Sequence, residues 1–142
     1  MNIGNHCPLC ASPGGRLVWQ GGEYRIVIAD DTPAPVLRVI WNAHVREMSD
    51  LDVTEQLGLM RAVFAAEAEL RALLAPDKIN LASLGNQVAH VHWHVVARFT
   101  DDSWFPDSIW SGLRRPGRRR AVEPAAIQAA LTQRLGAGRG TG

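Results

Sequence analysis

Three of the five histidines alternate along one short stretch of the chain, at His90, His92 and His94. The surrounding residues, 88–99, are rich in valine and aromatic side chains and predict a β-strand. Because side chains alternate along a strand, the three imidazoles would share one face, and the interleaved residues on the other face are all apolar. An imidazole-rich face indicates a chemical site, since core packing does not select buried imidazoles that lack partners.

Three interpretations of this strand are open. The histidines are structural residues with satisfied hydrogen bonds, which is uncommon for three on one face. They bind a metal, to which one strand contributes two or three imidazoles. Alternatively, one imidazole is a nucleophile and its neighbours bind phosphate or transfer protons; a neutral imidazole near pH 7 needs no separate base for this.

The two cysteines of the chain, Cys7 and Cys10, are separated by two residues. One loop with this spacing can give two thiolates to a tetrahedral metal ion. A structural disulfide is disfavoured, because cysteines two residues apart in a cytosolic protein rarely form one. A thioredoxin-like redox pair is disfavoured, because no strand leads into the motif and no helix begins with it. Metal binding and a pair of unused thiols remain open.

Apolar and β-branched runs predict the strands that position these residues, at 16–20, 24–30, 36–41, 79–84 and 88–99. Gly21-Gly22-Glu23 separates the first two and indicates a hairpin. The expected fold class is therefore α+β, an antiparallel sheet of about five strands combined with helices.

Two helices complete the predicted elements. Apolar residues at three- and four-residue spacing predict a long helix from about Asp52 to Ala75, capped by Asp52 with Glu55 or by Ser49 with Asp52. A short helix is predicted over 124–135, with Ile127, Leu131 and Leu135 on one face.

Length and charge limit the classes of function. A chain of 142 residues suits one hydrophobic core, and the net charge of +1 gives no general attraction to nucleic acid or membranes. No apolar run approaches the roughly 20 residues that cross a bilayer. The N-terminus lacks the pattern of a secretory signal, so we expect a cytoplasmic protein.

The five arginines within 114–120 are expected to form a solvated, mobile segment, with a polyanion or partner contact as the alternative.

The stretch around the alternating histidines resembles the histidine triad (HIT) family. Residues 90–96 fit the pattern His-φ-His-φ-His-φ-φ, where φ is apolar, and a Gly85-Asn86-Gln87 turn precedes them. The resemblance extends over about residues 7 to 100 and implies a HIT-like fold. Residues 1–113 would form the HIT domain with its Cys-x-x-Cys loop. Residues 114–142 would carry the arginine-rich segment, the short helix and a disordered tail.

The resemblance also implies the chemistry of the site. In this family the middle histidine attacks the α-phosphate of a nucleotide and forms a nucleotidyl-histidine that water cleaves. His92 would then be the nucleophile, with His94 as a hydrogen-bond donor and His90 as the third catalytic histidine. The nucleotide-binding residues implied are Asp30 at the ribose, Asn80 and Asn86 near the phosphate, and Gln87. Asp31 is an alternative to Asp30, and Gln87 stands where relatives often have Ser or Thr facing the leaving group.

A subset of the family binds zinc with a cysteine pair and two histidines. The matching residues here are Cys7, Cys10, His44 and His90, which predicts a structural zinc ion that the chemistry itself does not require. The alternative is that the site has lost its metal and His90 orients its neighbour. Proteins of this family are commonly homodimers, so a homodimer is expected too.

Two classes of function follow from the resemblance. The first is a hydrolase or transferase that cleaves the α-phosphate of an AMP- or GMP-containing molecule: a dinucleoside polyphosphate, a nucleoside phosphoramidate or an adenylylated substrate. The second is a non-catalytic, zinc-stiffened module that binds nucleotides or a partner, and the intact triad argues against it. Trp104, Phe105 and Trp110 are interpreted as a cover for the core, or as a lid or docking element.

Overall fold

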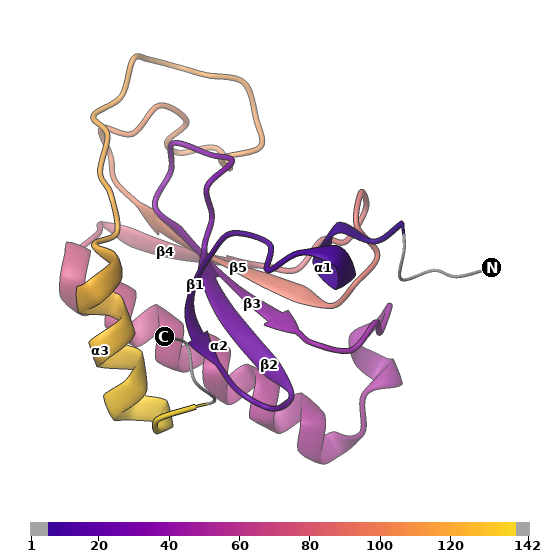
Figure 1. Ribbon diagram of the computed structural model, residues 1–142. Coiled ribbons are helices and arrows are strands. Elements are labelled where there is room, and N and C mark those ends of the chain that lie inside the picture. Colours follow the sequence, from indigo (N-terminus) through magenta and orange to yellow (C-terminus); the bar gives the residue numbers. More distant parts are fainter. Residues whose placement is uncertain (1–5, 139–142) are drawn as a thin grey trace.

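The computed structural model describes residues 6–138 and contains one five-stranded antiparallel sheet (Figure 1). The strand order is β1-β2-β3-β5-β4. The strands are β1 (Arg16–Gln20), β2 (Tyr24–Ile28), β3 (Val36–Trp41), β4 (Lys78–Ala82) and β5 (His92–Arg98). The helices are α1 (Pro8–Ala11), α2 (Val53–Leu74) and α3 (Pro124–Leu135), with a 3-10 turn η2 (Met48–Asp50) before α2. The predicted α+β class is confirmed.

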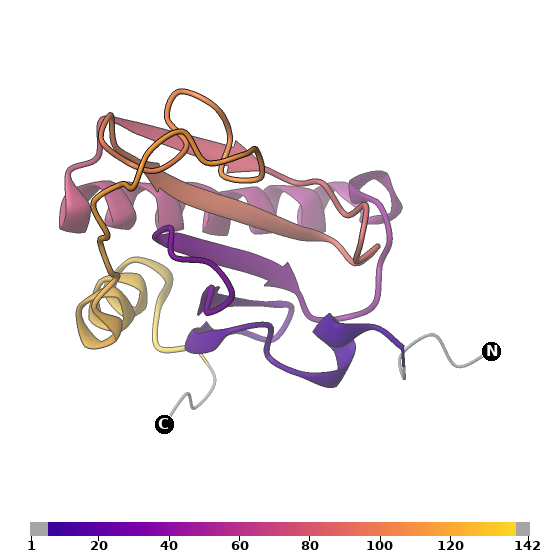
Figure 2. The same cartoon turned by 90° about the horizontal axis from the view of Figure 1, so that it is seen from above.

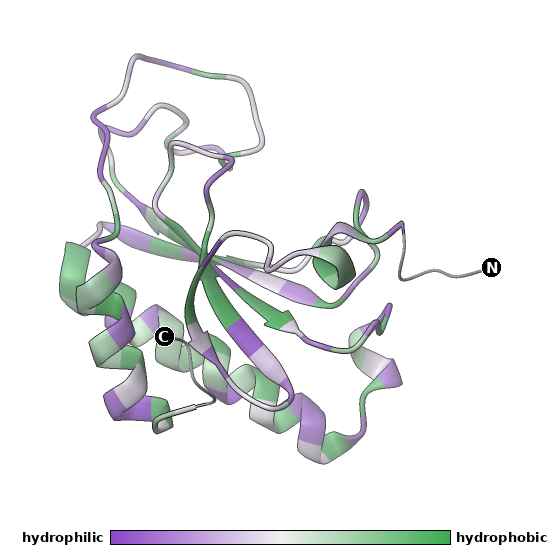
Figure 3. Cartoon of the chain, in the orientation of Figure 1, coloured by the Kyte–Doolittle hydropathy of each residue, from purple (hydrophilic) through white to green (hydrophobic). Residues whose placement is uncertain are grey.

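Helix α2 covers one face of the sheet, along which it runs in Figure 2. Its buried side chains include Leu59, Val63 and Leu70, which pack with strand residues such as Val39 and Val95. Burying a side chain of this size stabilises the fold by roughly 1.5–3 kcal/mol. Figure 3 shows the corresponding hydrophobic stretches along the strands, interrupted by hydrophilic positions.

The ends of α2 follow the predicted capping signals. The Asp52 carboxylate accepts from the Glu55 backbone N–H at 2.8 Å, and the Glu55 carboxylate accepts from the Asp52 N–H at 2.8 Å. The helix ends at Leu74, and the capping residue Ala75 has a left-handed φ of 47° and precedes Pro76. The alternative start, with Ser49 as the cap, is wrong because Ser49 lies inside η2.

The other face of the sheet is covered in two separate places. At one place Cys7 and Leu9, from the loop that holds α1, pack on Val27 and Ile40. At the other, Trp104 packs on Val36 and Val96. Between these two covers lies a cleft, lined by Arg38 of β3 and by His92 and His94 of β5.

The segment after β5 is more tightly held than its sequence predicts. Arg114 and Arg120 pair with Asp107 and Asp101, each at 2.7 Å, so these arginines of the predicted solvated run are bound to the chain. Helix α3 packs on α2 and β1 through Ile127 and Leu131, both fully buried. The run of like charges in the sequence does not predict the two ion pairs.

Two predictions concern the C-terminal tail and membrane-spanning segments. Residues 1–5 and the last part of the predicted disordered tail, 139–142, lie outside the described residues. Within the tail, the Gly136 carbonyl oxygen accepts from Trp19 Nε1 at 3.0 Å. Among the helices of residues 6–138, none has the length and apolar character needed to cross a membrane.

Candidate functional site

His92 and His94 form the floor of a cleft of about 990 Å³ on the face of the sheet opposite α2. The two side chains lie on the same side of β5, and their ring centroids are 5.0 Å apart. Both residues are buried, with 9% and 7% of their surface exposed. The alternation inferred from the sequence is therefore present at these two positions.

The hydrogen bond of His92 defines which ring nitrogen is free to react. Its Nδ1 lies 2.6 Å from the carbonyl oxygen of His90. A carbonyl only accepts, so Nδ1 carries the proton and Nε2 carries the lone pair. Burial lowers the pKa of His92, the bond to the His90 carbonyl raises it, and the positive charge of Arg38 lowers it, with a net lowering. A neutral imidazole with an unprotonated Nε2 is the form that acts as a nucleophile.

His94 is also neutral near pH 7. Burial is the main cause that lowers its pKa to about 4, and His92 and Arg38 lower it further while Asp31 raises it. A neutral imidazole has one N–H donor and one acceptor nitrogen. His94 can therefore donate one hydrogen bond to an oxygen of a ligand that lies above His92.

Arg38 is a residue of the cleft that the sequence analysis missed. It lies in β3 directly opposite His94 in the strand register. Its Nη2 donates to Asp31 at 2.7 Å and its Nη1 donates to the Gly14 carbonyl oxygen at 3.1 Å. The available signal was one charged residue in an otherwise apolar strand, which indicates either a buried ion pair or a site. The guanidinium makes this part of the cleft attractive to anions.

The predicted nucleotide-binding residues fall in two places. Asp30, Asn86 and Gln87 line the cleft together with His92 and His94, as does the alternative residue Asp31. Asn80 is not among the residues that line it. Its Oδ1 accepts from Arg98 Nη1 at 2.7 Å, so the structure gives this side chain a partner within the protein.

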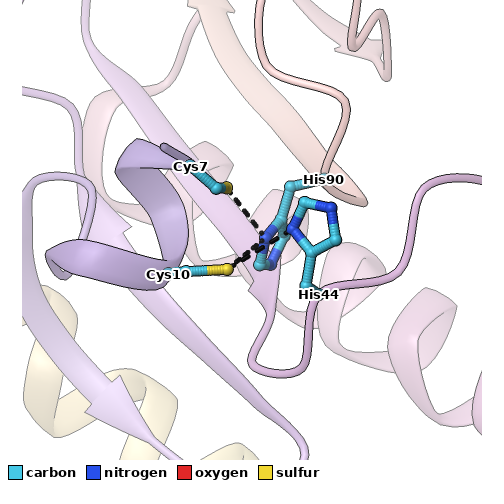
Figure 4. A group of neighbouring side chains, drawn as sticks. All are labelled: Cys7, Cys10, His44 and His90. Carbon is cyan, nitrogen blue, oxygen red and sulfur yellow. Dashed lines mark hydrogen bonds between the residues drawn. The ribbon is translucent and has the colours of Figure 1, made fainter. Parts of the chain in front are cut away.

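The four predicted zinc ligands lie together at one end of this face (Figure 4). One ligand atom from each of Cys7, Cys10, His44 and His90 lies within 4.8 Å of all the others. Nδ1 of His90 is 3.4 Å from Cys7 Sγ and 3.5 Å from Cys10 Sγ, and Nδ1 of His44 is 3.4 Å from Cys10 Sγ. A tetrahedral zinc ion would separate its sulfur and nitrogen ligands by roughly 3.5 Å. The donor set and these separations fit zinc.

His90 lies just before the regular strand, because β5 begins at His92 and not at residue 88 as predicted. Its Nε2 donates to the Trp41 carbonyl oxygen at 2.5 Å, which leaves Nδ1 unprotonated and facing the two sulfurs. A histidine that binds a metal commonly has its other ring nitrogen bonded to a carbonyl in this way. The first histidine of the alternating set therefore belongs to the cysteine–histidine cluster, and the next two belong to the cleft.

A buried arginine, also missed from the sequence, attaches the cysteine loop to the sheet. Arg25 of β2 is 7% exposed. Its guanidinium donates to the carbonyl oxygens of Leu9 at 2.6 Å and of Pro13 at 2.9 Å, and to Asn42 Oδ1 at 3.1 Å. These bonds hold the short helix α1, and with it both cysteines, against β2 and β3. The expectation that no helix begins at the cysteine motif is wrong, because α1 begins at Pro8 with Cys7 as its N-cap.

Comparison with known proteins gives a family and a set of similar folds. The family model for the HIT domain matches residues 17–101. A histidine triad protein from Bradyrhizobium japonicum is 24% identical with a TM-score of 0.69, and the match covers 87% of this chain and 92% of that chain. One from Sinorhizobium meliloti has the same identity and TM-score and covers 87% and 91%. A zinc-bound histidine triad family protein from Mycobacterium smegmatis is 21% identical with a TM-score of 0.62, covering 92% and 96%. None of the curated proteins matches the chain in sequence.

Proposed function

The chain belongs to the histidine triad family, and from this membership we propose that it cleaves nucleotide substrates at the α-phosphate through a nucleotidyl-histidine on His92. The observation that carries the proposal is the state of the His92 ring. Its Nδ1 proton is held by the His90 carbonyl at 2.6 Å, and the ring lines a cleft large enough for a nucleotide. The substrate would be an AMP- or GMP-containing dinucleoside polyphosphate, phosphoramidate or adenylylated molecule.

The reaction has two balanced steps. His92 Nε2 attacks the α-phosphorus and forms a phosphorus–nitrogen bond, while the bond from phosphorus to the leaving group breaks. The leaving group departs with the electron pair of that bond and takes up a proton from water in the open cleft. Water then attacks the same phosphorus, the phosphorus–nitrogen bond breaks, and the proton that water loses balances the first. Negative charge on the phosphoryl oxygens would be stabilised by the His94 N–H, the Asn86 and Gln87 carboxamides and the Arg38 guanidinium.

The test is nucleotide release combined with detection of the covalent intermediate. Wild type incubated with diadenosine tetraphosphate or adenosine phosphoramidate should release AMP, and mass spectrometry after a rapid denaturing quench should find protein carrying one AMP. His92→Asn should lose both signals, with a rate loss of at least about a thousandfold. His6→Asn, which changes an exposed histidine that does not line the cleft, is the matched control. If AMP binds but neither substrate is cleaved, the chain is the non-catalytic nucleotide-binding module.

We propose a structural zinc ion on Cys7, Cys10, His44 and His90 as the second part of this function. The sulfur-to-nitrogen separations of 3.4–3.5 Å support it, as does the fold shared with a zinc-bound relative. When bound, zinc would fix the loop of α1 against the start of β5. The reacting atoms at His92 do not require it, because the nucleophile is an imidazole.

We also propose that two copies associate through β4 and α2. Within residues 6–138, strand β4 is an edge strand and pairs only with β5. Val53, Leu57 and Phe64 of α2 are more than half exposed, and Leu81 of β4 is 38% exposed. An unpaired strand edge next to exposed apolar side chains is typical of a surface that pairs with another chain. Sedimentation of wild type should give a dimer and Phe64→Glu a monomer; a wild-type monomer at high concentration would contradict the proposal.

A further inference from the structure

The segment that follows β5 carries two tryptophans in different environments. Trp104 is 9% exposed and packs on Ala29, Val36 and Val96, so it covers the core. Trp110 lies in the same segment and is 49% exposed. The core-covering role expected from the sequence thus belongs to Trp104, and Trp110 is left with a large accessible aromatic surface.

The Trp110 ring lies next to the histidines at the floor of the cleft. The Trp110 ring centroid is 5.0 Å from that of His94, with an angle of 70° between the ring planes. Trp110 and Ile109 line the same cleft as His92 and His94. Two successive ring contacts of 5.0 Å therefore connect the candidate nucleophile to Trp110 through His94.

A buried ion pair holds this segment in place. Arg98 Nε donates to Asp102 at 2.9 Å, and the Asp102 carboxylate also accepts from the backbone N–H groups of Phe99, Trp104 and Phe105. Arg98 Nη2 donates to the Asp107 carbonyl oxygen at 2.7 Å. These bonds fix the backbone on the N-terminal side of Trp110.

The arginine-rich run, on the C-terminal side of Trp110, also bonds to this segment. Arg115 Nη1 donates to the carbonyl oxygens of Asp102 at 2.7 Å and of Phe105 at 2.8 Å. The Gly117 N–H donates to Ser103 Oγ at 3.0 Å, and the two backbones lie so close that a Cβ at residue 117 would be 2.3 Å from the Ser103 nitrogen. Trp110 is thus presented by a segment whose position is set before any ligand binds, which lowers the entropy lost on binding.

We propose that Trp110 determines substrate specificity by stacking on a planar aromatic ring of the nucleotide substrate while the phosphate lies at His92. This inference rests on the proposed function and adds the substrate class: molecules with an aromatic ring within one nucleoside length of the α-phosphorus. The ring is either the nucleobase of the transferred nucleotide or an aromatic part of the leaving group. An exposed tryptophan suits both, because stacking uses the face of the ring and tolerates different bases.

The first experiment measures binding by calorimetry, with AMP and ribose 5-phosphate as probes. If the nucleobase stacks, Trp110→Leu weakens AMP binding about tenfold and leaves ribose 5-phosphate unchanged, and Trp110→Phe stays close to wild type. The comparison of Phe with Leu isolates the aromatic ring, since both side chains are apolar. Leu113→Ala, at a 73% exposed apolar residue that does not line the cleft, is the matched control.

The second experiment measures kcat/KM for two substrates that share AMP, adenosine phosphoramidate and an AMP ester or amide with an indole leaving group. If the leaving group stacks, Trp110→Leu lowers kcat/KM about tenfold for the indole substrate alone. Equal losses for both substrates, together with unchanged AMP binding, would mean that Trp110 only positions His94, and this would overturn the proposal.

The two proposals fail in different ways. If wild type cleaves neither substrate and AMP binding still depends on the ring at residue 110, the catalytic proposal fails and the stacking proposal stands. If cleavage occurs but the Phe and Leu variants behave alike in both experiments, the stacking proposal is wrong and the catalytic one stands. Thermal unfolding of each variant checks that the fold is intact.

Discussion

His92 donates its Nδ1 proton to the backbone carbonyl of His90 over 2.6 Å, while the ring of His90 faces the two cysteine sulfurs at 3.4 and 3.5 Å. One residue therefore contributes its side chain to the candidate metal site and its backbone to the candidate nucleophile. A change in the position of His90 alters both, and the first prediction follows from this link.

Removal of the metal should lower both stability and activity. Cys7→Ser/Cys10→Ser should contain almost no zinc by elemental analysis, where wild type contains about one ion per chain. Since a structural metal stabilises the folded state, the thermal midpoint should fall by roughly 5–10 °C. AMP release should also decrease, because the carbonyl that holds the His92 proton is less well placed. Ala11→Ser, at an exposed position of α1 that does not line the cleft, is a control for the loop itself. Equally low zinc in wild type and variant would contradict the metal assignment.

Protonation of His94 should destabilise the fold at acidic pH. The pKa of His94 is about 4 in the folded protein and near 6.5 in the unfolded chain, so the unfolded chain takes up its proton first as the pH falls. This contribution to stability is complete above about pH 6.5 and is lost between pH 6.5 and 4, up to about 3 kcal/mol. Urea unfolding of wild type and His94→Gln across this range isolates the effect, because carboxylates and the metal site titrate in both. Parallel curves would contradict it.

Arg38→Met should raise the pKa of His94 and weaken binding of phosphate-containing ligands. The guanidinium is one of the charges that lower this pKa, after burial and His92, so its loss moves the pKa upward. We expect AMP to bind about tenfold more weakly, since one charge-assisted bond to phosphate is lost. Nuclear magnetic resonance titration of the His94 ring measures the first effect and calorimetry the second. Arg61→Met, at an exposed position on α2, should change neither.

Two aspartate–arginine ion pairs in the segment after β5 should contribute differently to the free energy of unfolding. Asp102→Ala removes the partner of the buried Arg98 and the acceptor of five hydrogen bonds, so the free energy of unfolding should fall by about 3–5 kcal/mol. Asp107→Ala breaks a pair with Arg114 in which both side chains are about half exposed, and it should cost less than about 1 kcal/mol. Equal losses in urea unfolding would show that Asp102 does not organise the segment.

Much of the fold could be predicted because local patterns specify it, whereas the cysteine–histidine cluster could be predicted only through the family resemblance. The 3.6-residue spacing and the Asp52–Glu55 capping box predicted α2 to within one residue at each end. Cys7, Cys10, His44 and His90 could be predicted as one cluster because the family resemblance supplied the long-range pairing. Spacing alone would have joined only the two cysteines.

The cleft was harder to predict because its walls depend on contacts between distant segments. The role of Arg38 depends on its register opposite His94, which no local pattern specifies. Asn80 was predicted near the phosphate, but its Oδ1 accepts from Arg98 at 2.7 Å, and that arginine is placed by Asp102 beyond the end of the strand. The arginine-rich run was predicted to be mobile from its like charges, whereas its partners, Asp101 and Asp107, precede it in the folded segment.

The residues proposed to react lie on strands, whereas the side walls of the cleft are formed by connecting segments. The floor lies on the paired strands β3 and β5, and the walls include the loop that carries Pro13 and the segment that carries Trp110. Replacements or insertions in those two connections can exchange the molecule that is accepted while the strands keep the same chemistry. Libraries restricted to residues 12–15 and 109–110 should accordingly yield variants with altered substrate preference.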